Sequence, residues 1–310
     1  MAVYVNTNYS ALQGQRYLGN VQNSLTTTYQ RLSSGMRINS AKDDAAGLQI
    51  ADRLTSQING LNQGNRNASD GIALAQTIES GIDEISGMLQ KVRTLAVQAA
   101  NGTNTSEDRS ALAKEASALV AEMQRISQQT TYGGKQVLAG GDPKDGTKTI
   151  YGSAGTGTNG GTLVLQIGSN KGDTISFCVA NFTFSKLANG ITAGFNTKTD
   201  TGIKTVSKGT AVAFSDAAAA QNLIESMDKL IAKVDGQRAA LGAIQNRLES
   251  SIRNQSNVAA NEADARSRIR DADFAEESAN LSQQSIIQQA ASAMLMQANT
   301  RPQLGLSLLG

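Results

Sequence analysis

The stretch IDEISGMLQKVRTLAVQA, residues 82–99, decides the fold that we expect for this chain. Its apolar side chains recur at alternating steps of three and four residues, at Ile82, Ile85, Leu89, Val92, Ala96 and Ala99. Such spacing places them in one narrow stripe along a helix, which is typical of a coiled-coil seam. The alternative is an ordinary amphipathic helix within a bundle.

Similar stripes lie on both sides of this stretch. They comprise Leu54, Ile58, Leu61, Ala68, Ile72 and Ala75 upstream, Leu112, Ala116, Leu119, Met123 and Ile126 downstream, and Leu223, Met227, Leu230, Val234, Leu241, Ile244 and Leu248 further on. Asn65 and Gln237 occupy seam positions, where a polar residue either sets helix register or faces solvent. We therefore predict a mainly α protein built from long antiparallel coiled-coil-like helices.

Residues that stop and start helices divide the first hundred positions. A Ser-Ser-Gly run at 33–35 ends a first helix, and residues 39–40 can cap a second one. Asp43 and Asp44 would then lie in its first turn, where the helix dipole favours negative charge. Without a strong stop before about Ala100, this second helix would be ~85 Å long.

The middle of the chain has a different composition. Thr105 and Asp108 resemble a capping box for a third helix. Beyond it, residues 139–214 are rich in Gly and Thr, and alternating apolar residues predict a β-hairpin near 163–179. We expect residues 181–214 to form a small, exposed, β-rich insert.

Composition excludes several classes of function. The 310 residues include no His and one Cys, Cys178, so a Ser-His-Asp triad, an HExxH zinc site and a Cys-His dyad are impossible. Carboxylate or Lys chemistry remains possible but would need a formed pocket. We expect no enzyme, no cofactor and no metal. The 28 basic and 26 acidic residues are interspersed, which argues against nucleic acid as a partner. No apolar run approaches the ~20 residues that span a bilayer, which argues against a membrane.

The two chain ends are amphipathic but have no obvious surface to pack on. The N-terminal segment, 1–40, carries Leu18, Val21, Leu25 and Leu32, and the C-terminal segment, 274–310, carries Phe274, Ile287, Met294 and Leu295. A single pair of such helices is marginal in water, because the apolar burial barely offsets the cost of ordering the backbone. We predict ends that are mobile in the monomer and helical in an assembly; the alternative is a plain disordered tail.

Four motifs resemble those of the bacterial flagellin family. They are RLSSGMRINSAKDDAAGL at 31–48, QKVRTLAVQ at 90–98, SRIRDADFAEE at 267–277, and QAN at 297–299 followed by LSLLG at 306–310. The resemblance covers roughly residues 1–140, the hairpin region and residues 215–310.

The resemblance implies a filament subunit that drives swimming motility. The segments 1–40 and 274–310 would pair as filament-core helices. Residues 41–180, completed by 215–273, would form the long-helix domain, and residues 181–214 the insert. The first residues, MAVYVNTN, lack the basic segment and the apolar segment of a signal peptide. The family is exported unfolded by the flagellar type III apparatus without a cleaved signal peptide, which reconciles this start with an extracellular flagellum. Implied partners are other copies of the chain, the flagellar cap, hook-junction proteins and an export chaperone.

The resemblance also implies a partner in animals, the flagellin-sensing Toll-like receptor. The family positions that this receptor grips correspond here to Gln90, Lys91, Arg93, Leu95 and Glu115. Lys91 stands where the family usually has Arg, and this change removes a planar bidentate donor. These residues could instead serve only the contact between subunits.

Two alternative functions remain open at this point. One is a hook–filament junction protein, which resembles flagellin at both ends. The other is a secreted coiled-coil adhesin, whose ends would already be folded in the monomer.

Overall fold

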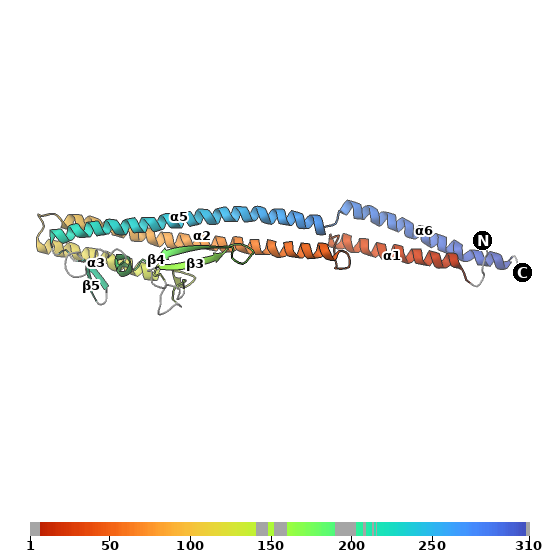
Figure 1. Cartoon of the computed structure of the whole chain (residues 1–310), viewed down its shortest axis with the longest axis horizontal. Coiled ribbons are helices and arrows are strands. Elements are labelled where there is room, and N and C mark those ends of the chain that lie inside the picture. The colour runs from red at the N-terminus through yellow and green to blue at the C-terminus, as the bar shows by residue number, and fades with distance from the viewer. Residues whose placement is uncertain are drawn as a thin grey trace. The chain divides into compact units, whose positions relative to one another are not determined.

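The computed structural model describes residues 7–140, 148–151, 160–189, 203–206, 209–212, 214 and 216–307. Its elements, in chain order, are α1 (Tyr9–Ser34), α2 (Ala45–Ala99), α3 (Ser106–Gln129), β1 (Thr131–Tyr132), β2 (Lys135–Gln136), β3 (Gly160–Gln166), β4 (Thr174–Ala180), α4 (Phe184–Asn189), β5 (Ile203–Val206), β6 (Gly209–Val212), α5 (Ala217–Arg270) and α6 (Phe274–Ser307) (Figure 1). The predicted fold class is confirmed, because long helices precede and follow a short β-rich middle in the chain.

Internal contacts divide the chain into two units. The terminal unit comprises Met1–Asn59 with Val258–Gly310, and the central unit comprises Gly60–Asn257. Helices α2 and α5 contribute residues to both units. The terminal unit therefore contains the first turns of α2 and the last turns of α5 as well as α1 and α6, which is more of the chain than the predicted segments 1–40 and 274–310.

The ends of α1 and α3 follow the expected capping chemistry. Gly35 adopts the left-handed conformation (φ 70°) after α1 and donates its N–H to the carbonyl of Arg31 at 2.8 Å. At the start of α3, the Thr105 hydroxyl accepts from the Asp108 N–H and the Asp108 carboxylate accepts from the Thr105 N–H. The predicted capping box is confirmed.

The start of α2 differs from the expectation. The helix begins at Ala45, and the carboxylate of Asp44 accepts a hydrogen bond from the Gly47 N–H at 2.9 Å. Asp44 is therefore the residue that caps α2, and residues 39–40 do not cap it. Asp43 lies outside the helix, because its carboxylate accepts from the N–H groups of Asn39 and Ser40 instead.

The apolar stripes form the core of the central unit. The six apolar residues of the α2 stripe between Ile82 and Ala99 are all buried. Ala116 and Met123 of α3 and the α5 stripe from Leu223 to Leu248 are buried as well. Helices α2, α3 and α5 therefore meet along the faces that periodicity predicted.

The predicted hairpin is confirmed as β3–β4, an antiparallel pair in which Leu163 lies opposite Phe177. Alternation along β4 buries Phe177 and Val179 and leaves Cys178 exposed. The hairpin lies along α2 (Figure 1). Gly64 permits this approach, since a Cβ built there would lie 1.8 Å from the carbonyl oxygen of Ile167.

Five apolar residues of the predicted insert are packed into the core. These buried residues are Phe182, Phe184, Leu187, Val212 and Phe214. The Ser117 hydroxyl of α3 bonds to both the N–H and the carbonyl of Val212, each at 3.1 Å. The structure thus places these positions in the interior instead of at the exposed surface that we expected, because α3 offers them an apolar face; residues 190–202 lie outside the described residues.

Candidate functional site: the surface of the terminal helix pair

Helices α1 and α6 run antiparallel, side by side, in the terminal unit (Figure 1). Near the chain ends, the Asn8 side-chain amide donates to the carbonyl of Ala298 at 2.9 Å. Further along, a Cβ at Gly14 would lie 2.9 Å from a methyl group of Leu295. At the other end, Arg31 contacts Glu277. One register therefore relates the two helices along their length.

The pair buries few apolar side chains. On α1, Val21 and Leu25 are buried. Among the described residues of α6 the single buried side chain is a carboxylate, that of Glu277. The half-buried residues of α6 that share its face recur at steps of three or four: Leu281, Gln284, Gln288, Ala291, Leu295 and Ala298. The contact face of α6 is thus polar or small in most positions.

Large apolar side chains of both helices remain exposed in this pair. On α1, Tyr17 is 63% exposed, and on α6, Ile286 and Met294 are 66% and 71% exposed. Tyr9, Leu12, Tyr29 and Met296 are exposed as well. Contiguous apolar groups left in water mark a surface that another molecule covers.

The predicted packing residues divide into two sets. Val21 and Leu25 are buried, and Leu18, Leu32 and Leu295 are half-buried. Phe274, Ile287 and Met294 are exposed. That all eight residues pack in a filament core stays a prediction, because a single chain does not test contacts between copies.

A network of backbone hydrogen bonds joins the end of α1 to the end of α5. The Arg270 carbonyl accepts from the N–H of Arg37 at 2.7 Å and from that of Ile38 at 3.3 Å, and the Ala272 N–H donates to Gly35 at 3.0 Å. The Arg37 guanidinium donates to the carbonyl of Ile269. These contacts satisfy carbonyls that the last turn of α5 would otherwise leave unpaired.

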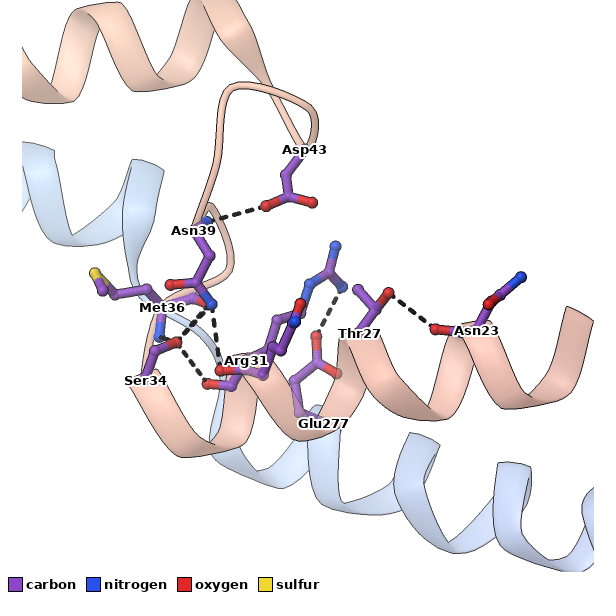
Figure 2. Close-up of polar contacts among 9 residues, drawn as sticks. Asn23, Thr27, Arg31, Ser34, Met36, Asn39, Asp43 and Glu277 are labelled. Atoms are coloured by element: carbon purple, nitrogen blue, oxygen red, sulfur yellow. Dashed lines mark hydrogen bonds and ion pairs between the residues drawn. The ribbon is translucent and has the colours of Figure 1, made fainter.

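Side chains order the loop between α1 and α2 (Figure 2). The Asn39 amide donates to the Ser34 hydroxyl at 2.7 Å and to the Gln30 carbonyl at 3.2 Å. Backbone N–H groups of Ser40 and Asn39 stabilise the charged carboxylate of Asp43, so the pKa of Asp43 lies below its ordinary value. The loop is therefore a defined structure stabilised by an ionised Asp43.

An ion pair follows this loop in the helix pair. Arg31 and Glu277 point toward one another from α1 and α6, with Nη1 2.9 Å from Oε1 (Figure 2). Glu277 is only 6% exposed. Its Oε2 and the Nε of Arg31 are buried and have no hydrogen-bond partner among the described residues. Burial of an incompletely bonded charged pair is costly, so the contact is not explained by stability alone.

The residues predicted to contact the animal receptor lie in the central unit. Gln90, Lys91 and Glu115 are exposed. Arg93 reaches α5, where its Nε lies 2.6 Å from Oδ1 of Asp228. The side chain of Leu95 packs against the core. The structure thus leaves three of the five positions free to meet a partner.

Sequence reasoning missed two side-chain amides that bind the outer edges of the β3–β4 hairpin. Asn67 of α2 donates to the carbonyl of Gln166 at 2.8 Å. Gln237 of α5 donates to the carbonyl of Cys178 at 3.0 Å and accepts from the Ala180 N–H at 3.4 Å. Gln237 was identified as a polar seam residue, but its partner is the hairpin and neither a second seam residue nor solvent.

The described ranges contain neither a candidate metal centre nor a candidate membrane-spanning helix. Within them, no group of three or more Asp, Glu, Cys or His side chains is arranged to hold a metal ion. In the same ranges, none of the helices combines the length and the apolar character needed to cross a bilayer.

Comparison with known proteins places the sequence in context. Residues 5–142 match the bacterial flagellin N-terminal helical region, and residues 224–309 match the bacterial flagellin C-terminal helical region. Flagellin B of Vibrio anguillarum is 34% identical over 379 aligned positions, and flagellin A of Vibrio cholerae serotype O1 is 35% identical over 383. Both alignments cover 100% of this chain and 100% of the relative.

A solved structure has a related fold. It is described as a flagellar hook-associated protein from Vibrio parahaemolyticus, is 17% identical, and covers 74% of this chain and 100% of its own, with a TM-score of 0.51. At that identity the likeness concerns the fold alone. The alignments with the two flagellins are longer than the 310 residues of this chain, so those relatives contain residues that have no counterpart here.

Proposed function

Because this chain belongs to the bacterial flagellin family, it is a structural subunit of the extracellular flagellar filament and not an enzyme, and we propose that α1 and α6 become fixed only when neighbouring copies pack on them. The observation that carries this proposal is the exposure of Tyr17, Ile286 and Met294 on a helix pair with little buried apolar surface.

The approximate free energies of burial and of backbone ordering support the proposal. Val21 and Leu25 each contribute at most about 3 kcal/mol on burial. Ordering the backbone costs about 1–2 kcal/mol per residue, which helix hydrogen bonds only partly offset. An isolated α1–α6 pair is therefore marginal. Covering the outward apolar side chains adds burial without ordering further residues of the same chain.

The kind of polymer follows from the kind of contact. Copies that present different patches to one another make heterologous contacts, which grow into a helix when the rotation does not close. A subunit with apolar groups on several sides of its terminal helices is suited to such growth, because each copy touches more than one neighbour.

Hydrogen exchange tests this proposal. In dilute full-length chain, the amides of α1 and α6 should exchange quickly, and they should become protected after polymerisation on filament seeds. The amides of residues 82–99 serve as the internal control, because the core of the central unit should protect them in both states. Protection of α1 and α6 already in the dilute monomer would contradict the proposal.

The two alternative functions are not favoured. The two relatives that are 34% and 35% identical over their whole length are flagellins, which argues against a junction protein present in few copies. A secreted adhesin would need ends that are stable without neighbours, and the exposed side chains of α6 argue against that.

We also propose that the exposed part of the central unit meets the flagellin-sensing Toll-like receptor. Gln90, Lys91 and Glu115 support this proposal because they are accessible. Replacing all three with Ala should reduce receptor signalling by the soluble chain. Lys229→Ala, an exposed change on α5, is the matched control. Leu95→Asp is less informative, since a carboxylate against the core would unfold the unit. Undiminished signalling by the triple variant would count against this surface.

Further flagellar partners follow from family membership as proposals. The chain would leave the cell through the type III export apparatus with the help of a chaperone, and it would meet the cap and the hook-junction proteins. Expression in a strain without the export apparatus should leave the chain inside the cell, whereas a strain without the cap should release it unpolymerised into the medium.

A further inference from the structure

Apolar side chains lie on more than one face of α6, so no single face of this helix is marked for contact with α1 by apolar residues alone. Glu277 and Gln288 lie on the contact face, whereas Ile287 and Met294 are exposed. At 100° per residue, turning α6 by about a quarter turn would bring Ile287 and Met294 toward α1 in their place. That rotation would also remove Leu281 and Leu295, which are half-buried here, from the contact, so apolar burial alone does not choose between the two faces. Another interaction must therefore select the observed face.

The ion pair of Figure 2 is placed to make this selection. Arg31 lies in the last turn of α1 and Glu277 in the first turn of α6, where each charge also suits its helix dipole. The 2.9 Å contact joins positions 246 residues apart and buries the carboxylate. A buried polar contact that costs stability can instead specify how two helices pair.

We propose that Arg31 and Glu277 select the face of α6 that packs on α1, and so keep Ile287 and Met294 turned outward for neighbouring copies. This inference rests on the proposed function, in which those copies cover the outward face. The orphaned Oε2 of Glu277 and Nε of Arg31 fit it, because a contact retained for pairing does not need to be energetically optimal.

A second interhelical pair provides the comparison. Arg93 and Asp228 join α2 to α5 through two contacts, Nε–Oδ1 at 2.6 Å and Nη2–Oδ2 at 3.4 Å. Both side chains are about half exposed. The apolar stripes already determine how α2 and α5 face each other, so this pair has no face to select.

The test uses two pairs of cysteines in a Cys178→Ser background. Gly14 lies opposite Leu295 and Arg31 opposite Glu277, so position 21 of α1 lies at the level of about position 288 of α6. A crosslink between Val21→Cys and Gln288→Cys therefore reports the observed face of α6. Val21→Cys with Ile287→Cys reports the rotated face. Full-length chains with either pair are diluted into an excess of Cys178→Ser chains and polymerised on seeds. Oxidation then gives crosslinks within single chains, whose rates are compared.

Each cysteine pair is combined with Arg31→Met and Glu277→Leu, which fill the site with apolar groups and should keep the helices stable. In chains that keep Arg31 and Glu277, the parent, we expect the 21–288 crosslink to form at least about tenfold faster than the 21–287 crosslink. In chains with Arg31→Met and Glu277→Leu, the apolar variant, the two rates should become similar. Arg93→Met with Asp228→Leu is the matched control and should keep the parent ratio.

The outcomes separate the inference from the proposed function. An apolar variant that enters filaments with the parent ratio overturns the inference, because the ion pair would then contribute only packing. Loss of the preference supports it. Exclusion of the apolar variant from filaments that accept the control also supports it, since a wrongly turned α6 would not fit its neighbours. Failure of the Cys178→Ser chain itself to polymerise would count against the proposed function instead.

Discussion

Gly64 of α2 lies against the carbonyl of Ile167 at the end of β3, so closely that a methyl group at position 64 would meet the carbonyl oxygen at 1.8 Å. Gly60 and Gly71 of the same helix lie similarly close to Ser169 and Leu165. The hairpin therefore rests on the backbone of α2, and its position depends on the absence of side chains there.

Gly64→Ala should displace the hairpin and lower the free energy of unfolding by about 1–3 kcal/mol, because backbone at this distance has no flexible end that can yield. Chemical denaturation of the unassembled chain measures the change. Gly87→Ala is the matched control, since nothing lies within 4 Å of the new Cβ. It should be neutral or stabilise the helix by up to about 1 kcal/mol. A neutral Gly64→Ala would show that the hairpin is not held there.

Gln237→Ala should lower the free energy of unfolding by about 1–3 kcal/mol, because it removes the partner of the Cys178 carbonyl and of the Ala180 N–H. The amide of Ala180 should also exchange faster with solvent, which mass spectrometry or NMR can follow. Gln221→Ala, an exposed change on the same helix, should alter neither quantity. Equal effects of the two substitutions would remove Gln237 as a hairpin contact.

Leu89→Ala should cost about 2–5 kcal/mol of unfolding free energy, because the side chain is fully buried where α2 meets the core of the central unit. Val97→Ala, on the same helix but 48% exposed, should change it by no more than about 0.5 kcal/mol. The denaturation midpoints of the two variants provide the comparison, and similar midpoints would contradict the assigned core.

The capping box of α3 should make stability depend on pH. Hydrogen bonds from Thr105 hold the pKa of Asp108 below its ordinary value. The ionised carboxylate therefore contributes to the free energy of unfolding above its pKa in the unfolded chain, which is about 4. This contribution is lost as the pH falls through the lower pKa of Asp108 in the folded chain. Asp108→Asn should be less stable than the parent at pH 7, and the difference should shrink in acid. Glu107→Gln, in the same turn but outside the box, should show a smaller difference at pH 7.

The regular part of the fold was predictable from the sequence because its signals are periodic or local. The stripe from Ile82 to Ala99 identified the buried face of α2, since only residues three and four apart share a side of a helix. The capping box at Thr105 and the turn at Gly35 depend on neighbours within a few positions. Such interactions can be read without knowing the tertiary structure.

The remaining features depend on contacts between distant residues. Gln237 binds a strand almost sixty positions away, and nothing in its own helix indicates that partner. Phe182, Phe184 and Phe214 became core residues because α3 offers a face to them. Glu277 is buried although most glutamates are exposed, and only the proximity of Arg31 accounts for it.

Alternation along β4 turns Ile175, Phe177 and Val179 inward and leaves Cys178 outward, with the chain's single thiol in solvent. A maleimide dye would consequently couple once to each subunit, at a strand position whose neighbours hold it in place. Every filament grown from labelled chains would carry one fluorophore on each subunit. Light microscopy could then follow the rotating filament without any genetic alteration of the chain.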